Sequence, residues 1–510
     1  MCVWLLVLNM APVAHAQYFS NLYDYDSSSD FGLDVRILSD GNYLTIGGGL
    51  NATSHEQGLE WIVIAKDGSS IINKHGLSSS FGPYYVGWQG RVKTLSGGGY
   101  ILPVTEQRYK NPYTEYSECG IVKLNAALDT VFVKLYTDTS HYFESGDDVV
   151  VLPAGAGYIL GGTQADTAVD SLSSVLLVRI DTNGNLLWKH TYHKVSGDNE
   201  ELNSISLLAD GRILVGAQIE ALDGWPGDVY YRLTPWYILL DTAGNILKDL
   251  VWNSGHTGGG TIYPDANGGY IHFGALDTIL ASPSSALINF PNYVAHTDTN
   301  FLPDWGHRFP SNNGLSINTN IENVKQLHNG DYLAIGEELY DYPTSHIAYR
   351  GWAAKLDKKG NLLWERNYEI DTNRDCEFTD AQERADGSII LTGDGVNTAL
   401  PVWHYKDVWL LSIDSNGCEM PGCALGVPVV QTMGDELKVY PNPIKDAFTI
   451  ESAAAGQVEI YDAAGRRVVA YKVQQGINQY RFQDVSSGVY VGRYVSGDGG
   501  AVKMLRLVKE

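Results

Sequence analysis

A single pattern of apolar and polar positions recurs along most of the chain. Each copy contains a turn rich in Asp, Asn and Gly, a strand of alternating apolar residues, and two more strands that are usually joined by an Asp-x-x-Gly-Asn turn. The clearest copy is LHNGDYLAIG at 327–336 with WAAKLDKKGNLLWERNY at 352–368. Because such alternation is typical of half-buried strands and Asn-Gly of tight turns, the pattern predicts antiparallel strands throughout.

The copies are regularly spaced. The glycine of the first turn recurs seven times, at intervals of 54 to 61 residues. The seven glycines are Gly41, Gly99, Gly157, Gly211, Gly269, Gly330 and Gly387. One more short strand precedes each of these turns, so the repeating unit has four strands. Four-stranded units with this period predict the blades of a seven-bladed β-propeller.

The two ends of the repeat region complement each other. The seventh copy lacks a fourth strand, whereas the segment YFSNLYDYD at 18–26 has no first three strands before it. Phe19 and Tyr23 are four residues apart, as are Trp364 and Tyr368 of the sixth copy. The N-terminal segment is therefore predicted to supply the missing strand and to close the ring. An eight-bladed ring with a degenerate blade and an open solenoid are the alternatives.

A different pattern follows the repeats. Residues 424–434 carry no repeat and are interpreted as a linker. Residues 435–510 alternate in short strands divided by turns, which is typical of a small antiparallel, Ig-like β-sandwich. The expected organisation is all-β, with a propeller over 17–423, the linker, and a sandwich over 435–510.

Four motifs in this last segment resemble the type A C-terminal sorting domain of the type IX secretion system, in order and in spacing. They are VYPNP at 439–443, IYDAAGRRV at 460–468, SSGVYVGRY at 486–494 and KMLRLVKE at 503–510. The resemblance implies export from a Gram-negative bacterium of the Bacteroidetes group, with the secretion machinery as the partner of residues 435–510. It also implies a protein that passes through the periplasm and is then secreted or attached to the outer-membrane surface.

The N-terminus has the features of a signal peptide. It reads MCVWLLVLNMAPVAHAQ, and its apolar run is shorter than the roughly 18 residues that span a bilayer. Ala14 and Ala16 supply the small residues of a cleavage site, so cleavage is predicted between Ala16 and Gln17. The segment before the apolar run has no Lys or Arg, and a buried N-terminal strand is the alternative. No later segment reaches transmembrane length.

The charge and the cysteines bear on nucleic-acid binding, disulfide formation and metal binding. The formal net charge is −24, which disfavours nucleic acid as a partner because its phosphates require a basic patch. Cys418 and Cys423 flank a Pro-Gly turn and are predicted to form a disulfide in an oxidising compartment. Cys119 and Cys376 are interpreted as buried small hydrophobic residues. The cysteines are not clustered, so they predict no metal site.

One set of acidic residues is a candidate binding site. The position ten residues before the turn glycine includes Asp147, Glu201 and Glu377, and Asp148 and Glu200 are adjacent in sequence. Around one mouth of the central channel, these carboxylates would attract a cation or a basic group. No cofactor is predicted, and calcium is the one weakly indicated exception. The alternative is that the acids cap blade turns and face water.

Other chemistry is weakly indicated. The acid-rich segment YDYDSSSD at 23–30 lacks the Gly and the terminal Glu of a calcium loop, and is interpreted as a solvated turn. No Gly-x-Ser-x-Gly, His-Glu-x-x-His or phosphate-binding loop is present in the sequence. No catalytic residue is therefore predicted.

Two functions from different classes remain after this comparison. The first is a secreted or surface-displayed binding propeller, whose rim loops engage a glycan, a polymer or another protein. The alternative is a secreted carbohydrate-active hydrolase or lyase that uses the channel-mouth carboxylates. A passive structural component of the cell surface is a third. The absence of a recognisable catalytic motif favours binding, and the ligand cannot be read from the sequence.

Overall fold

The computed structural model describes residues 18–25, 29–50, 57–77, 84–85, 91–111, 114–136, 143–165, 172–194, 198–225, 228–252, 259–275, 292–309, 319–341, 347–370, 375–396, 406–419, 438–452, 455–461, 467–483, 485–496 and 502–509. The chain divides into two compact units, Met1–Gly422 and Cys423–Glu510. Among the described residues the only helix is a short 3₁₀ turn, η1 (Pro153–Gly155). None of the described segments forms a helix that is long and apolar enough to cross a membrane.

Unit 1 consists of antiparallel sheets that follow one another along the chain. Sheet 1 has the strand order β2 (Asp30–Ile37), β3 (Tyr43–Leu50), β4 (Gln57–Ile64), β5 (Ile71–Leu77). Sheet 2 has the order β10 (Thr130–Leu135), β9 (Thr114–Leu124), β8 (Tyr100–Asn111), β6 (Tyr84–Tyr85), and β7 (Lys93–Thr94) also pairs with β8. Sheet 3 has the order β11 (Phe143–Glu144), β13 (Tyr158–Ala165), β14 (Ser173–Ile180), β15 (Leu186–Tyr192), and β12 (Asp148–Val151) also pairs with β13.

The remaining sheets of unit 1 repeat this plan with four strands each. Sheet 4 has the order β16 (Asn199–Leu207), β17 (Ile213–Trp225), β18 (Asp228–Leu240), β19 (Ile246–Val251). Sheet 5 has the order β20 (Thr261–Pro264), β21 (Tyr270–Ala275), β22 (Asn292–Thr297), β23 (Pro303–Phe309). Sheet 6 has the order β24 (Thr319–Gln326), β25 (Tyr332–Asp341), β26 (Ile347–Leu356), β27 (Leu362–Tyr368). Sheet 7 has the order β28 (Cys376–Glu383), β29 (Ile389–Val396), β30 (Lys406–Ile413), β1 (Ser20–Tyr23).

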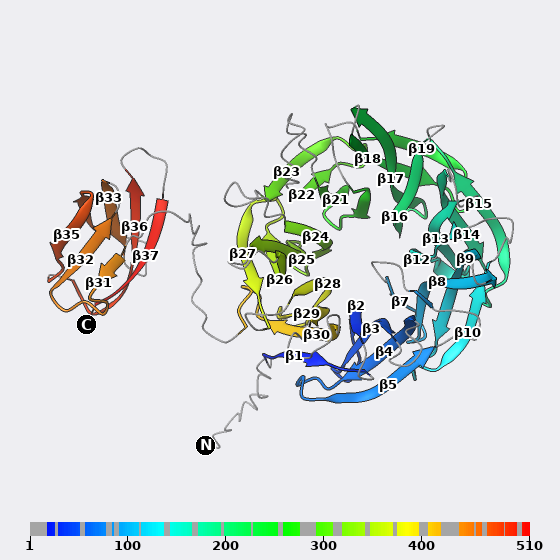
Figure 1. Cartoon of the computed structure of the whole chain (residues 1–510), viewed down its shortest axis with the longest axis horizontal. Coiled ribbons are helices and arrows are strands. Elements are labelled where there is room, and N and C mark those ends of the chain that lie inside the picture. Colours follow the sequence, from blue (N-terminus) through cyan, green and yellow to red (C-terminus); the bar gives the residue numbers. More distant parts are fainter. Residues whose placement is uncertain are drawn as a thin grey trace, which may run out of the picture. The chain divides into compact units, whose positions relative to one another are not determined.

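The sheets stand in chain order around a ring (Figure 1). Strands β2, β16 and β24 lie near its centre, and β5, β19 and β27 lie at its outer edge (Figure 1). Apolar side chains fill the space between neighbouring sheets. One buried cluster joins Ile205 and Trp236 of sheet 4 to Val175 of sheet 3, and another joins Trp409 of sheet 7 to Ile335 of sheet 6. The core is therefore a series of layers between sheets, as a propeller requires.

The N-terminal strand lies at the outer edge of the last sheet, as the sequence predicts. Strand β1 pairs antiparallel with β30, with Ser20 opposite Leu411 and Tyr23 opposite Val408. The phenolic hydroxyl of Tyr23 donates a hydrogen bond of 2.7 Å to the carbonyl oxygen of Gly68 in sheet 1. The last sheet is thus joined to the first by a segment from the start of the chain.

The same contact recurs between other neighbouring sheets. A tyrosine at or just after the end of an outer strand donates a hydrogen bond to a glycine carbonyl in the next sheet. That glycine lies in the second turn of its repeat, which follows the third strand. The pairs are Tyr136 to Gly184 at 3.1 Å, Tyr192 to Gly244 at 2.8 Å and Tyr368 to Gly417 at 2.9 Å. Tyr23 therefore occupies in sheet 7 the position that Tyr368 occupies in sheet 6.

The first turn of the repeat depends on glycine, because its backbone is left-handed. Gly330 has φ +84°, and its N–H donates to the carbonyl of Leu327 at 2.8 Å. In sheet 2 the glycine with this role is Gly98, which has φ +83°, and not the predicted Gly99. In sheet 5 Gly268, with φ +98°, donates this bond to Asp265, and the predicted Gly269 is also left-handed, with φ +89°. Within a run of glycines the sequence pattern cannot tell which residue turns.

Sheet 3 departs further from the predicted turn. Its first two long strands, β12 and β13, are joined by the 3₁₀ turn η1, and Ala154 there has φ +54°. The predicted turn glycine, Gly157, instead directly precedes β13. The extra residues shift the alignment of this repeat, which matters for the candidate site.

Unit 2 has two antiparallel sheets around one core. The first has the order β31 (Lys438–Tyr440), β32 (Ala447–Ser452), β35 (Gly476–Arg481). The second has the order β34 (Arg467–Val473), β33 (Gly456–Tyr461), β36 (Gly488–Ser496), β37 (Val502–Lys509). Phe448 and Ile450 of the first sheet share a buried cluster with Val458 and Ile460 of the second.

Several predicted features lie outside the described residues. These are the cleavage site between Ala16 and Gln17, the linker at 424–434, and Cys423, so the disulfide to Cys418 stays a prediction. Cys119 and Cys376 are free and buried, as expected. Burial raises the pKa of the Cys376 thiol to about 12, which suits an unreactive core residue.

Candidate functional site

A polar position recurs on the central strands. In sheets 1, 4, 6 and 7 the first strand contains a bulge, and the residue after it pairs with the fourth residue of the next strand. Every residue at this register, here called the inner rung, is polar or charged. The inner rung is Asp34, Arg91, Asp148, Ser204, Thr261, Asn323 and Asp380.

The inner rung ties neighbouring sheets together. The carboxylate of Asp34 accepts a hydrogen bond of 3.0 Å from the Val92 N–H of the next repeat, and Asp148 accepts one of 3.0 Å from Ile205. The bond that crosses from sheet 7 to sheet 1 runs from the Val35 N–H to Asp380 at 3.1 Å. Because buried N–H groups must be paired, these side chains have a structural role.

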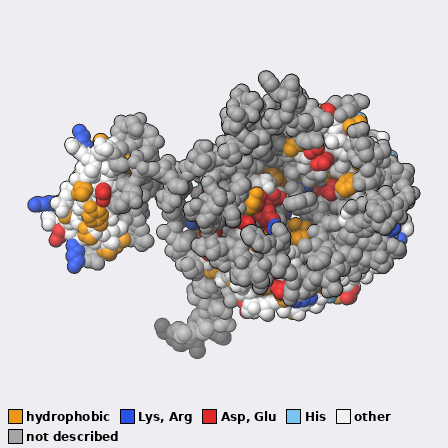
Figure 2. All heavy atoms as spheres, viewed as in Figure 1, with side chains coloured by type: hydrophobic (Ala, Val, Ile, Leu, Met, Phe, Trp, Pro, Cys, Tyr) orange, Lys and Arg blue, Asp and Glu red, His pale blue; other side chains and the backbone are white. Residues whose placement is uncertain are grey.

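Four acidic residues lie on the first two strands of sheets 6 and 7. They are Glu322 of β24, Glu337 of β25, Glu377 of β28 and Asp394 of β29, here called the acidic group. Glu377 lies directly opposite Asp394 in the strand pairing. The ammonium of Lys406 lies 3.0 Å from a Glu377 carboxylate oxygen and 2.9 Å from one of Asp394. Figure 2 shows Asp and Glu side chains in the hollow at the centre of unit 1.

The acidic group resists full ionisation. Burial, together with the charges of Glu377 and Glu322, raises the pKa of Glu337 to about 8. Burial and Glu377 raise the pKa of Asp394 to about 8 and that of Glu322 to about 7. Like charges near one another in a poorly solvated site each favour the neutral acid. Among the described residues, Lys406 alone pairs with this group, through Glu377 and Asp394, and it does not balance four carboxylates.

A second acidic set, of Asp147, Glu201 and Glu220, lies on sheets 3 and 4. Burial, then the charges of Glu201 and Asp148, raise the pKa of Asp147 to about 7. The amide of Gln218 donates to Glu201 at 3.0 Å and to Glu220 at 3.3 Å. Burial and the charge of Glu201 also raise the pKa of Glu220. Carboxylates thus accumulate on both of these parts of the ring.

Two of the five predicted site residues lie elsewhere. Asp148 belongs to the inner rung and forms ion pairs with Arg91 and Lys93, both at 3.1 Å. The 3₁₀ turn η1 shifts this repeat, which is why counting from Gly157 misplaces it. Glu200 is fully buried, contacts His193, and accepts a hydrogen bond of 3.1 Å from the Lys194 N–H. Neighbouring residues of a strand point to opposite faces, so Glu200 cannot accompany Glu201.

The other three predicted residues, Asp147, Glu201 and Glu377, take part in the acidic clusters just described. Their role in binding stays a prediction. Sequence reasoning missed Glu337 and Asp394, because only the first strand of each repeat was considered. Both lie seven residues after the turn glycine of their repeat, so a forward count of seven along the second strand would have found them.

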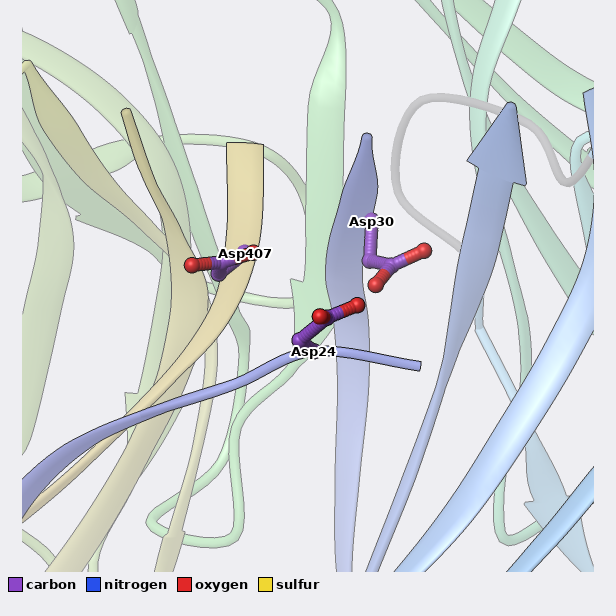
Figure 3. A group of neighbouring side chains, drawn as sticks. All are labelled: Asp24, Asp30 and Asp407. Carbon is purple, nitrogen blue, oxygen red and sulfur yellow. The ribbon is translucent and has the colours of Figure 1, made fainter. Parts of the chain in front are cut away.

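A third set of carboxylates lies where the ends of the ring meet. Asp24 follows β1, Asp30 begins β2 and Asp407 lies in β30, and Figure 3 shows the three close together. One carboxylate oxygen from each lies within 4.8 Å of the other two. Oxygen ligands of this kind suit Ca²⁺. The sequence predicts a solvated turn for Asp24 and Asp30, because the segment lacks the Gly and the terminal Glu of a calcium loop, but Asp30 is buried in the structure. Asp407 is distant in the sequence, so the pattern did not place it with them.

Residues 438–509 match the family model of the secretion system C-terminal sorting domain. This range covers the described strands of unit 2, and it confirms the resemblance drawn from the four motifs. The protein thus carries a type IX secretion system sorting domain and is exported, either secreted or held at the outer-membrane surface. No curated protein matches the sequence.

Solved structures resemble the chain only distantly. PorZ, described as an essential bacterial surface component of the type-IX secretion system of Porphyromonas gingivalis, aligns over 93% of this chain and 74% of its own, with 12% identity and a TM-score of 0.29. The GH93 α-L-arabinofuranosidase of Fusarium graminearum aligns over 78% and 98%, with 11% identity and a TM-score of 0.40. The β-propeller domain of the Trilobed protease from Pyrococcus furiosus aligns over 79% and 96%, with 9% identity and a TM-score of 0.33. Similarities this weak carry no argument about function.

Proposed function

We propose that this exported protein is a binding protein, in which a closed seven-bladed propeller presents an acidic channel mouth and rim loops to a ligand outside the cell. The ligand would be a protein, a glycan or a polymer that offers a cationic group to the mouth. The Ig-like sandwich of unit 2 would serve export. Closure by β1 and by the Val35–Asp380 bond supports the seven-bladed ring.

The observation that carries the proposal is the acidic group. Four carboxylates around one lysine have raised pKa values in three cases, because burial and mutual repulsion disfavour their charge. An arriving cation would relieve that repulsion. A ring of like charge around a narrow opening also focuses the field and attracts the opposite charge. Calcium is the one inorganic cation proposed here.

Spermine and short lysine peptides are suitable probes of this mouth. We expect the mature chain to bind them in isothermal titration, and the Glu322→Gln/Glu337→Gln variant to bind roughly tenfold more weakly. This variant leaves Glu377 and Asp394 to pair with Lys406. Asp210→Asn, which removes an exposed carboxylate, is the matched control and should bind as the parent does. Equal affinities for all three proteins would contradict the proposal.

The alternative is a hydrolase or lyase. A carboxylic acid whose pKa is raised to about 8, as for Glu337 and Asp394, could act as a general acid near neutral pH. Turnover of polysaccharides by the mature chain, lost in Glu337→Gln and kept in Asp210→Asn, would favour the enzyme. Assays with and without calcium would separate binding that needs the cation from binding that does not.

Removal of residues 438–509 tests the role of unit 2. The truncated protein should accumulate in the periplasm, because the sorting domain is what the secretion machinery recognises. Immunoblots of periplasmic, outer-membrane and culture fractions would measure the distribution. A truncated chain that still reached the medium would show that export uses another part of the protein.

A further inference from the structure

The centre of the ring contains a small cavity with a basic lining. Its volume is about 200 Å³, and the first strands of several sheets contribute to it. Its charged lining residues are Arg36, Arg91, Lys93, Lys325, Asp34 and Asp380. Bases therefore outnumber acids in the lining, although the whole chain carries a net charge of −24.

Nearby carboxylates leave the cavity positive. Arg36 and Lys325 both contact Asp380, at 3.2 Å and 2.5 Å, and Lys93 and Arg91 share Asp148. Asp34, the third acid, contacts Arg36. Burial raises the pKa of Asp34, and the charge of Arg36 opposes that shift. Four bases thus face at most three carboxylates.

Arg91 is the residue with unused hydrogen-bonding capacity. Its side chain is buried, with 6% of the residue exposed, and one terminal nitrogen, Nη1, lies 3.1 Å from Asp148. Its Nε and Nη2 atoms form no hydrogen bond of normal geometry among the described residues, although a polar contact with Tyr263 contributes to the raised pKa of Arg91. The guanidinium carbon lies 4.9 Å from the centre of the Tyr263 ring, which also lines the cavity. Burying a hydrogen-bond donor without an acceptor costs free energy, so Nε and Nη2 of Arg91 would be stabilised by an acceptor.

We propose that the cavity is a binding site for a small oxyanion or carboxylate, held by Arg91 through Nε and Nη2 and neutralised by Lys93 and Lys325. The planar guanidinium matches two oxygens of one anion. Burial and the charge of Arg91 lower the pKa of Lys93, and the negative charge of a bound anion would favour its protonated form. At about 200 Å³ the cavity is smaller than the roughly 300–1,000 Å³ of drug-sized sites, which restricts the ligand to a small anion.

Two neighbouring hollows extend the same lining. One, of about 470 Å³, is bordered by Arg36 and Lys93, and the other, of about 320 Å³, by Arg36 and Lys325. Three of the four bases thus border more than one space, which leaves room for an anion to approach. This site is separate from the acidic group, whose residues do not line it, so failure of one proposal leaves the other standing.

Inorganic sulfate and phosphate are the probes for the test. Titration of the full mature chain at constant ionic strength, with chloride replaced by sulfate or phosphate, should show saturable binding and a rise in melting temperature. Arg91→Lys keeps the charge next to Asp148 but lacks the fork, and should weaken binding about tenfold or more. Arg212→Lys, at an exposed pair with Asp210, is the control and should bind as the parent does.

A second measurement does not depend on the variants folding. A crystal of the parent protein soaked in selenate should show anomalous density next to Arg91 in the cavity. Sulfate and phosphate binding that is absent, or equal in the parent and Arg91→Lys, would overturn the proposal. So would a cavity without selenate density, because Nε and Nη2 would then be buried donors that an anion does not reach.

Discussion

A chain that begins at residue 26 is expected to be less stable by about 5 kcal/mol or more than one that begins at residue 17. The shortened chain loses β1 (Ser20–Tyr23), which pairs with β30 at the outer edge of sheet 7. Tyr23 is only 6% exposed and packs with Val35 and Tyr43 of sheet 1. Burial of one large side chain contributes roughly 1.5–3 kcal/mol, and each net hydrogen bond contributes about 1 kcal/mol.

The stability lost with β1 should be measurable by thermal and urea unfolding followed by tryptophan fluorescence. For a ring of this size a change of about 5 kcal/mol corresponds to roughly 5–10 °C in melting temperature. The shortened chain also exposes the edge of β30, which favours association between molecules. Unfolding at several protein concentrations would separate that effect from lost stability.

Two point variants provide a matched comparison. Tyr23→Phe removes the hydroxyl that bonds to Gly68, and Tyr368→Phe removes the hydroxyl that bonds to Gly417 within the ring. If β1 closes the ring by the same contact, each of the two substitutions should lower the free energy of unfolding by about 1 kcal/mol. A cost for Tyr368→Phe alone, or a shortened chain as stable as the parent, would show that the ring does not depend on its N-terminal strand.

The sequence predicts the strands well because their signals are local. Alternation and a turn glycine are decided within about ten residues, and Gly330 with its neighbours behaves as the pattern requires. The position of β1 was also predictable, because four-residue spacing between Phe19 and Tyr23 repeats that between Trp364 and Tyr368. The wrong turn residues, Gly99 in place of Gly98 among them, arise where adjacent glycines are equally able to turn.

The candidate site was predictable only in part, because it is built from contacts between sheets. Counting along the first strand reaches Glu377 but not Asp394, which lies opposite it on the next strand. Whether an acidic residue on the first strand of a repeat forms an ion pair depends on the residues of the neighbouring repeat. Asp148 illustrates this point, since it forms ion pairs with Arg91 and Lys93 of the preceding repeat, which a count along its own strand does not reveal.

Glu337→Gln is expected to stabilise the protein at pH 9 by roughly 1–2 kcal/mol and to leave its stability nearly unchanged at pH 5. Burial and the charges of Glu377 and Glu322 raise the pKa of Glu337 to about 8. In the unfolded chain a glutamate titrates near 4.3. The folded state therefore holds more protons between these values, and stability decreases as the pH rises through that window.

The size of the effect follows from the pKa difference, with a discount. One pKa unit corresponds to about 1.4 kcal/mol, but Glu337 is partly exposed and shares its protons with neighbours, so only part of the difference is expected. Other groups act on the parent in the same window. His272, whose pKa burial lowers to about 3, makes stability decrease as the pH falls below about 6.5. The comparison of variant and parent at each pH cancels that contribution.

Urea unfolding of parent, Glu337→Gln and Asp210→Asn at pH 5, 7 and 9 measures the effect. Asp210 is exposed and its pKa is lowered by its contact with Arg212, so its replacement should bring no gain at pH 9. A Glu337→Gln variant that lost stability at pH 9 would mean that the nearby positive charge of Lys406 compensates this carboxylate fully. The acidic group would then be a satisfied ion-pair network, and it would have no surplus negative charge with which to hold a cationic ligand.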